Sequence, residues 1–424
     1  MRSARSRRAH LPSGPRTGAP HRSVIASVLI LFLGAFLASA PGALADNHET
    51  DIPCGISSNV TPAPVSSKQI NLVLDDSGSM FIDTDGNPVQ KWSYAKYAIE
   101  VFGALLGPED SMSIYKTSDF VDGPSVVGPL ELDGASGPES NVEQIHSMEL
   151  AGGKTAYGAV EQAADDLTTS DADEKWLVIL TDGKFEDDEN TVGRDQLESD
   201  LQEFAEAYST TERPFKIAFM GIGEEKSVVV PSGEYPGITV VRARDDDDLI
   251  KKMTGFANLI FERTELPQAS ASSAGWAPDV PLDEVIVFAQ GPNVSVSSAS
   301  TTDGDTPPLS VVKVQWADNS PVGQDRDVPA VPDKDLEGVV AVYENIPAGV
   351  LGFDLSNEST VEVFYKPKVN FAVKLLDPTG KEVRADKVVG DTYTVEYGFF
   401  DENCEPIESE LIGDYESTAT ITNA

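Results

Sequence analysis

The sequence predicts a mostly parallel, doubly wound α/β domain followed by β-sandwich-type modules, and three observations support this fold class. Short, wholly apolar runs such as Trp176–Leu180 alternate with segments of helical spacing between residues 68 and 266. Such runs are typical of parallel strands that helices bury on both faces. After Leu266, strand-like runs recur between turn signals, without helical spacing. The length of 424 residues allows two or three domains.

The α/β region begins with a predicted strand at Ile70–Leu74, and a helix with one apolar face follows from Trp92 to Leu106. Further strands are expected at residues 112–115, 126–132, 176–180, 215–220 and 238–241, and further helices at about 156–167, 197–208 and 249–261. The acidic run Asp245–Asp248 precedes the last helix, where acidic side chains complement the helix dipole. Ligands of such sheets bind at the carboxyl ends of the strands, so functional residues are expected there.

The region after the α/β domain is predicted to be antiparallel β structure. Strands are expected at residues 284–288, 294–297, 311–315, 338–343, 361–365, 371–376 and 393–399. We divide them into a β-sandwich-like module over residues 267–365 and a second, Ig-like β module over residues 366–424. The second module is short for a whole sandwich, so it is either incomplete or shares strands with the first.

The N-terminus has the pattern of a secretory signal peptide over residues 1–45. Six arginines and no acidic residue are followed by an apolar run at residues 24–38 and by the small residues of Ala43–Ala45. We expect cleavage after Ala45, a linker at residues 46–67, and a secreted or cell-surface protein whose mature chain does not insert into the membrane. An uncleaved anchor is the alternative, because the apolar run is near the lower length limit of a membrane span.

The charge balance argues against polyanionic partners. The chain has 31 Lys and Arg against 70 Asp and Glu, which gives a net charge of −39. Nucleic acid and anionic membrane surfaces need clustered cationic side chains, so neither is expected as a partner. An acidic surface does suit divalent cations and solubility outside the cell.

Histidine and cysteine are too scarce for several kinds of site. After cleavage only His48 and His146 remain, so a zinc site rich in histidine is excluded and a Ser-His-Asp triad would need His146. We expect His146 to be a surface helix residue. Cys54 and Cys404 either pair in the oxidising environment outside the cell or remain as free or intermolecular thiols.

Oxygen-bearing side chains follow three of the predicted elements. Asp75, Ser77 and Ser79 end the first strand, Thr155 lies in a loop before a helix, and Asp182 ends the strand Trp176–Leu180. In a parallel sheet these positions share one edge. Two carboxylates and three hydroxyls form a hard-oxygen ligand set that suits Mg²⁺, with Mn²⁺ or Ca²⁺ as alternatives.

This pattern resembles the von Willebrand factor A family and its metal-ion-dependent adhesion site. The family motif D-x-S-x-S matches Asp75, Ser77 and Ser79, the loop threonine matches Thr155, and the distal acid matches Asp182. The resemblance covers residues 68–263. It implies a six-stranded sheet with one antiparallel edge, direct coordination by the three hydroxyls, and coordination by the two carboxylates often through water.

Two features depart from the family pattern. Lys154 stands directly before the threonine, so a shift of one residue would put lysine in the ligand position. The segment 81–88 extends the loop after Ser79, and its Asp83, Asp85 and Asn87 resemble part of a calcium loop, although a solvated turn is the simpler interpretation. The acidic segment 186–189 is interpreted as a solvated loop that could screen out acidic ligands.

The leading functional hypothesis is an extracellular adhesion or ligand-binding protein without enzymatic activity. Its metal would coordinate a carboxylate of a protein or glycan partner. One alternative is a structural component of a cell-envelope assembly. Another is a secreted hydrolase with two catalytic carboxylates, an alternative that the abundance of acidic residues leaves open. For the site itself, the alternative is a metal that only rigidifies the loops and binds no outside ligand.

Overall fold

The computed structural model describes residues 67–82, 85, 89–107, 109–118, 126–131, 137–187, 190–210, 213–223, 228–244, 246–266, 276–315, 337–356, 360–376, 378–379, 394–400, 407, 409 and 411. The predicted signal peptide, Cys54, Cys404 and His48 lie outside these residues. The chain divides into two compact units. One holds Thr61–Val369 with Ile407–Glu416, and the other holds Asn370–Pro406 with the two chain ends.

A six-stranded sheet forms the centre of the α/β region, as the resemblance implied. Its strands lie in the order β3-β2-β1-β4-β7-β8. Their bounds are Lys68–Leu74 (β1), Ser111–Lys116 (β2), Val126–Glu131 (β3), Glu174–Thr181 (β4), Phe215–Ile222 (β7) and Ile238–Ala243 (β8). Only the edge strand β3 runs antiparallel to its neighbour; the other pairings in this sheet are parallel. The predicted α/β fold class is therefore confirmed.

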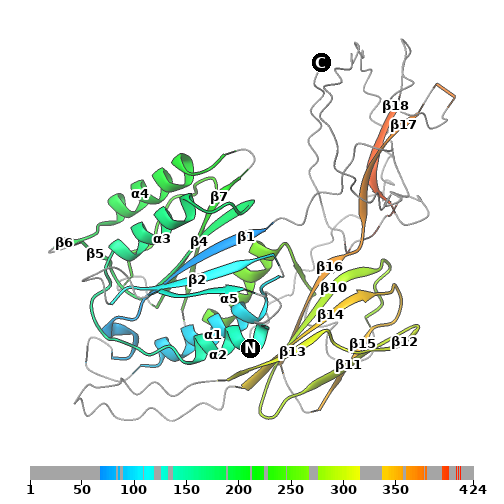
Figure 1. The fold of residues 1–424 in the computed structure, drawn as a ribbon, viewed down its shortest axis with the longest axis horizontal. Helices are drawn as coiled ribbons and strands as arrows, with labels where there is room; N and C mark the ends of the chain where they lie inside the picture. Colours follow the sequence, from blue (N-terminus) through cyan, green and yellow to red (C-terminus); the bar gives the residue numbers. More distant parts are fainter. Residues whose placement is uncertain are drawn as a thin grey trace, which may run out of the picture. The chain divides into compact units, whose positions relative to one another are not determined.

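Helices cover both faces of this sheet (Figure 1). Their bounds are Lys91–Ala104 (α1), Pro138–His146 (α2), Gly158–Thr168 (α3), Arg194–Ala207 (α4) and Asp246–Phe261 (α5). Helices α1, α2 and α5 pack on one face, where alternate residues of β1 such as Ile70 and Leu72 point toward them. Helices α3 and α4 pack on the other face, against Val73 of β1 and Leu177 of β4. This double burial explains the wholly apolar strands of the sequence.

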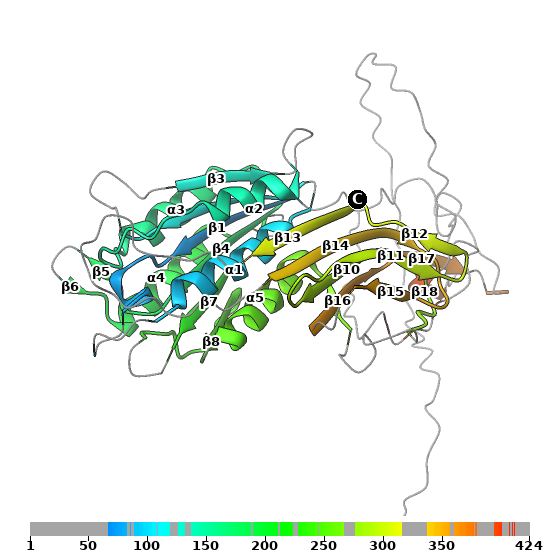
Figure 2. The same ribbon diagram turned by 90° about the horizontal axis from the view of Figure 1, so that it is seen from below.

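The β region of the same unit contains a five-stranded antiparallel sheet in the order β13-β14-β10-β16-β9. Its strands are Thr264–Glu265 (β9), Leu282–Gln290 (β10), Ser310–Gln315 (β13), Glu337–Ile346 (β14) and Thr360–Pro367 (β16). A smaller sheet has the order β12-β11-β15, with strands Val296–Thr301 (β11), Gly304–Thr306 (β12) and Gly352–Leu355 (β15). In Figure 2, β13 and β14 lie beside α1, and β13 contacts both α1 and α2.

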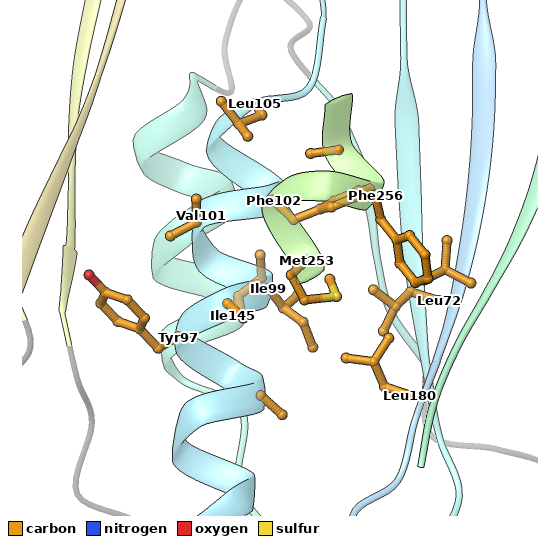
Figure 3. Close-up of a cluster of buried hydrophobic side chains, with 14 of the residues drawn as sticks. Leu72, Tyr97, Ile99, Val101, Phe102, Leu105, Ile145, Leu180, Met253 and Phe256 are labelled. Atoms are coloured by element: carbon orange, nitrogen blue, oxygen red, sulfur yellow. The ribbon is translucent and has the colours of Figure 1, made fainter. Parts of the chain in front are cut away.

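The two faces of the five-stranded sheet belong to different hydrophobic cores. Along β10, Ile286 and Phe288 join the core of α1, α2 and α5, whereas Val285 and Val287 join a core with the smaller sheet. Figure 3 shows Tyr97 of α1 pointing away from the α/β sheet strands that carry Leu72 and Leu180. The α/β region and the β region therefore share one continuous core. The sequence analysis expected separate modules and did not include such a core.

Two partly buried sets of polar contacts also join these regions. Glu100 of α1 accepts a hydrogen bond from the backbone N–H of Gln315, the last residue of β13, at 3.2 Å. Arg263 donates to both carboxylate oxygens of Glu284 on β10, at 2.6 and 3.2 Å, and to the carbonyl of Leu105 at 3.0 Å. Bidentate pairs of this kind fix geometry as well as charge.

In the other compact unit, the described residues include an antiparallel hairpin of strands Asn370–Leu376 (β17) and Thr394–Phe400 (β18). Short elements complete the description: Gly78–Met80 (η1), Glu186–Asp187 (β5) and Asn190–Thr191 (β6). Within the described part of the chain, no helix is long and apolar enough to cross a bilayer.

Candidate metal site

Asp75 lies at the centre of the candidate site, directly after β1. Its backbone N–H donates to the carbonyl of Leu180 on β4 at 2.9 Å, which continues the parallel pairing past the end of the strand. The side chain is fully buried. Its Oδ2 accepts hydrogen bonds from the hydroxyl of Thr181 at 2.7 Å and from the backbone N–H of Asp182 at 3.4 Å. The edge of the sheet therefore fixes the orientation of this carboxylate.

The environment of Asp75 makes its negative charge unfavourable. Burial, followed by the nearby Asp182 carboxylate, raises the pKa of Asp75 to about 6. Hydrogen bonds from Ser77 and Thr181 oppose this shift but do not cancel it. Two buried like charges at short range are unfavourable unless a positive charge lies between them. The buried carboxylates therefore favour a positive charge close to them, whether it comes from a side chain or from an ion.

Ser77 and Ser79 connect Asp75 to Asp182. The backbone N–H of Ser77 donates to Asp75 Oδ1 at 3.0 Å, and its hydroxyl lies 3.0 Å from the hydroxyl of Ser79. The Ser79 hydroxyl donates to Asp182 Oδ1 at 2.7 Å. The short helix η1 after β1 thus brings Ser79 to Asp182 at the end of β4, and the two form one polar cluster although they are 103 positions apart in the sequence.

Thr155 completes the set from the loop before α3. Its hydroxyl donates toward Asp75 Oδ1 and Oδ2 at 3.3 and 3.4 Å. Gly153 forms a parallel bridge with Ser77, and a Cβ at Gly153 would lie 2.8 Å from the carbonyl oxygen of Ser118. Only glycine fits this close approach at Gly153, and the neighbouring Gly152 has a positive φ of 70°, which also favours glycine. Lys154 itself points outward, with 71% of its side chain exposed, and pairs with Glu186 at 3.2 Å.

All five side chains predicted from the sequence therefore converge. A Cβ at Gly183 would lie 3.9 Å from both the Ser79 and Thr155 hydroxyls, so these two oxygens face the same small space. No group of three or more His, Cys, Asp or Glu side chains in the described residues is placed to hold a metal ion. Here hydroxyls make up most of the donor set, and the residues present fit a Mg²⁺ ion. That they bind one stays a prediction.

Asp76 is a residue of the site that the sequence analysis missed. It is fully buried and accepts hydrogen bonds from the backbone N–H and the hydroxyl of Ser118, at 2.8 and 2.5 Å. Lys116 pairs with it at 3.1 Å. Its carbonyl accepts from Gly152 at 3.0 Å, so Asp76 links the motif to the loop that carries Thr155. Asp76 stands between Asp75 and Ser77 of the motif, and this position is the sequence signal that could have indicated its part in the site.

Lys91 and Thr181 were also missed. Lys91, the first residue of α1, places its Nζ 2.5 Å from Asp182 Oδ2. No sequence pattern connects these two residues, because the contact depends on how α1 is positioned over the sheet. Thr181 directly precedes Asp182, so its contact with Asp75 could have been inferred from the strand end. Of the suggested calcium-loop residues only Asp85 is described, and it is exposed; Asp83 and Asn87 lie outside the described residues.

No family model and no curated protein matches the chain. Several solved structures do, at low identity. A von Willebrand factor type A protein from Catenulispora acidiphila shares 18% identity, with 70% of this chain and 66% of that one covered and a TM-score of 0.32. The pilus adhesin SpaC from Lactobacillus rhamnosus GG shares 11%, with 82% and 52% covered and a TM-score of 0.33. The vWF domain of the type V pili tip protein Mfa5 from Porphyromonas gingivalis shares 10%, with 47% and 96% covered and a TM-score of 0.30.

The chain thus spans about two thirds of the first of these structures and about half of the second. Two of these structures are described as von Willebrand factor type A or vWF domains, the family that the motif of this chain resembles.

Proposed function

We propose that this chain is an exported binding protein that uses a Mg²⁺ ion to hold a carboxylate of its partner. The observation that carries the proposal is the convergence of Asp75, Ser77, Ser79, Thr155 and Asp182 at the carboxyl edge of the sheet. When bound, Mg²⁺ would supply a Lewis-acidic coordination position that an outside oxygen can fill.

The residues of the site leave such a position available. Ser77, Ser79 and Thr155 would hold the ion through neutral hydroxyls, so they contribute no charge that would neutralise it. Asp75 and Asp182 supply two negative charges, and both side chains are buried. A divalent ion held mainly by neutral ligands keeps its attraction for a further anionic oxygen. A carboxylate on a protein side chain or on an acidic glycan has the required chemistry.

Hydrogen bonds from several segments hold the side chains of the site in place, which favours binding. The Asp75 carboxylate accepts bonds from Thr155, Thr181 and Ser77, which belong to three separate segments. Asp76 links two of these segments through Ser118 and Gly152. A site preorganised in this way holds its geometry before the partner arrives, which lowers the entropy cost of binding.

The proposal is tested by capture of the mature protein on an immobilised panel of matrix proteins and acidic polysaccharides. Capture is measured by biolayer interferometry in millimolar MgCl₂ and again in EDTA. We expect at least one surface to bind in Mg²⁺ only, and amidation of the carboxylates of that surface to abolish capture.

The matched variants are Thr155→Ala, which removes one proposed ligand, and Thr155→Ser, which keeps the hydroxyl. Capture should be lost in the first and retained in the second. Capture that persists in EDTA, or that survives both Thr155→Ala and amidation, would remove the metal and the carboxylate from the mechanism.

A further inference from the structure

The buried carboxylate of Asp182 already has a cationic partner within the chain. Lys91 Nζ lies 2.5 Å from Asp182 Oδ2, while Asp182 Oδ1 accepts the Ser79 hydroxyl at 2.7 Å. The Asp182 side chain is 0% exposed and the Lys91 side chain 24% exposed. Both carboxylate oxygens are therefore engaged, and one of them is engaged by a full positive charge.

The position of Lys91 is unfavourable unless this contact is made. Lys91 begins α1, and no acidic side chain lies in the first turn of that helix. A cation at a helix N-terminus opposes the helix dipole. Asp182 offsets this repulsion, and Lys91 in turn neutralises a buried carboxylate that would otherwise be strongly destabilising. Removal of Lys91 would therefore leave a buried carboxylate without a compensating charge.

The same contact opposes a divalent ion. Asp182 is one of the two carboxylates that would balance the charge of a metal, and an ammonium group at 2.5 Å cancels its charge. Two cations that share one carboxylate repel each other at short range in a site of low dielectric constant. Since its side chain is partly exposed, Lys91 has a route to solvent when a metal enters.

We propose that Lys91 is a tethered competitor of the divalent ion: it occupies Asp182 in the metal-free protein and must be displaced when the metal binds. This inference rests on the metal site of the proposed function. It means that the metal affinity is set by the equilibrium between two cations and not by the five oxygen ligands alone. The site then loads only where the concentration of divalent ions is high.

The test is the affinity of the full-length mature protein for Mn²⁺, measured by isothermal titration calorimetry. Lys91→Met removes the charge and keeps a side chain of similar length. Lys184→Met is the matched control, because Lys184 is exposed, lies two residues after Asp182 and gives the same change in net charge. We expect Lys91→Met to bind Mn²⁺ about tenfold more tightly or better, which is about 1.4 kcal/mol, and Lys184→Met to stay within about twofold.

Thermal unfolding provides a second readout. In EDTA, Lys91→Met should unfold at a lower temperature than the wild type, because Asp182 loses its partner, and Mn²⁺ should raise the unfolding temperature more in the variant than in the wild type. Lys91→Gln, which keeps a hydrogen-bond donor without the charge, serves where the methionine variant does not fold.

The outcomes separate this inference from the proposed function. If the wild type binds Mn²⁺ and neither Lys91 variant binds it more tightly, the role of Lys91 is overturned and the metal site stands. An equal gain in Lys184→Met would also overturn it, because the effect would then come from net charge alone. If none of the proteins binds Mn²⁺, the metal site fails and the competition fails with it.

Discussion

Asp75 and Asp182 are buried carboxylates that follow the neighbouring strands β1 and β4, and they determine the chemistry of the site. Burial, followed by the charge of Asp182, raises the pKa of Asp75 to about 6, which expresses the unfavourable energy of ionising Asp75 at this place. Lys91 relieves part of that energy from one side. The three hydroxyls add donors without adding charge. At the scale of single residues, the site is therefore a buried polar cluster whose oxygens would suit the divalent ion that we propose.

Thr155 is the first residue to test, because its hydroxyl is a proposed metal ligand. Thr155→Ala should lower the affinity for Mn²⁺ by about ten- to hundredfold, which is the loss typical even of residues that only support a ligand. Thr155→Ser should bind within about threefold of the wild type, because the hydroxyl remains. Calorimetric titration measures both. Equal affinities of the alanine and serine variants would show that Thr155 is not a ligand.

Gly153 allows a second test, of how the loop that carries Thr155 is held. A Cβ at this position would lie 2.8 Å from the Ser118 carbonyl oxygen, so Gly153→Ala should lower the stability by about 1–3 kcal/mol. Gly255→Ala is the control, because nothing lies near its Cβ position in α5 and alanine there should raise stability by up to about 1 kcal/mol. Urea unfolding measures both, and a loss in the control as large as in Gly153→Ala would contradict the account.

Helix α1 has two buried faces, and this is the main feature at the scale of elements. One face carries Phe102, which packs toward the α/β sheet, and the other carries Tyr97, which reaches the β region (Figure 3). A Cβ at Gly338 would lie 2.7 Å from the Tyr97 hydroxyl oxygen, so β14 approaches α1 closely. Glu100 lies on the same helix, between His146 of α2 and Gln315 of β13.

The Glu100 contact predicts a pH dependence of stability. Burial raises the pKa of Glu100 above its usual value, although the Gln315 N–H and His146 partly oppose the shift. The folded protein therefore keeps a proton that the unfolded chain has released, and this contribution is present at low pH and is lost as the pH rises through the raised pKa. Glu100→Gln should flatten that part of the decline in the free energy of unfolding.

The measurement is urea unfolding of the wild type and of Glu100→Gln at intervals between pH 4 and pH 8, the range in which a buried carboxyl titrates. Glu206→Gln, on an exposed position of α4, is the control for the loss of one negative charge. A Glu100→Gln profile parallel to that of the wild type would mean that Glu100 titrates alike in the folded and unfolded states.

Periodicity predicted the elements well, because burial on two faces leaves a clear apolar pattern. The strand expected at Ile70–Leu74 is Lys68–Leu74, and the helix expected from Trp92 is Lys91–Ala104. The site could also be predicted, since D-x-S-x-S, Thr155 and Asp182 lie at the ends of elements whose order fixes their position. Lys91 could not, because its contact depends on the packing of α1 and not on any local pattern.

At the scale of the whole molecule, the shared core joins the α/β region to the β region of the same compact unit. The run Val285–Ala289 alternates between two cores, and the sequence shows only that it is apolar. Periodicity does not reveal which core each face enters, since both faces are equally hydrophobic. The consequence is that the two regions should unfold together.

Phe288 tests this coupling. It is almost fully buried against the helices, so Phe288→Ala should lower the stability by about 3–5 kcal/mol. All helices among the described residues belong to the α/β region. The far-ultraviolet circular dichroism of the helices, at about 222 nm, should therefore show the loss of stability, although the substitution lies in the β region. An unchanged unfolding midpoint of the helical signal would mean that the two regions are independent.

The most direct test of the central claim is anomalous diffraction from crystals soaked in Mn²⁺. The account predicts one strong peak at about 2.1–2.2 Å from the hydroxyl oxygens of Ser77, Ser79 and Thr155, with the Lys91 ammonium moved away from Asp182. A folded α/β region whose five side chains converge, but with no peak between them at millimolar Mn²⁺, would contradict it.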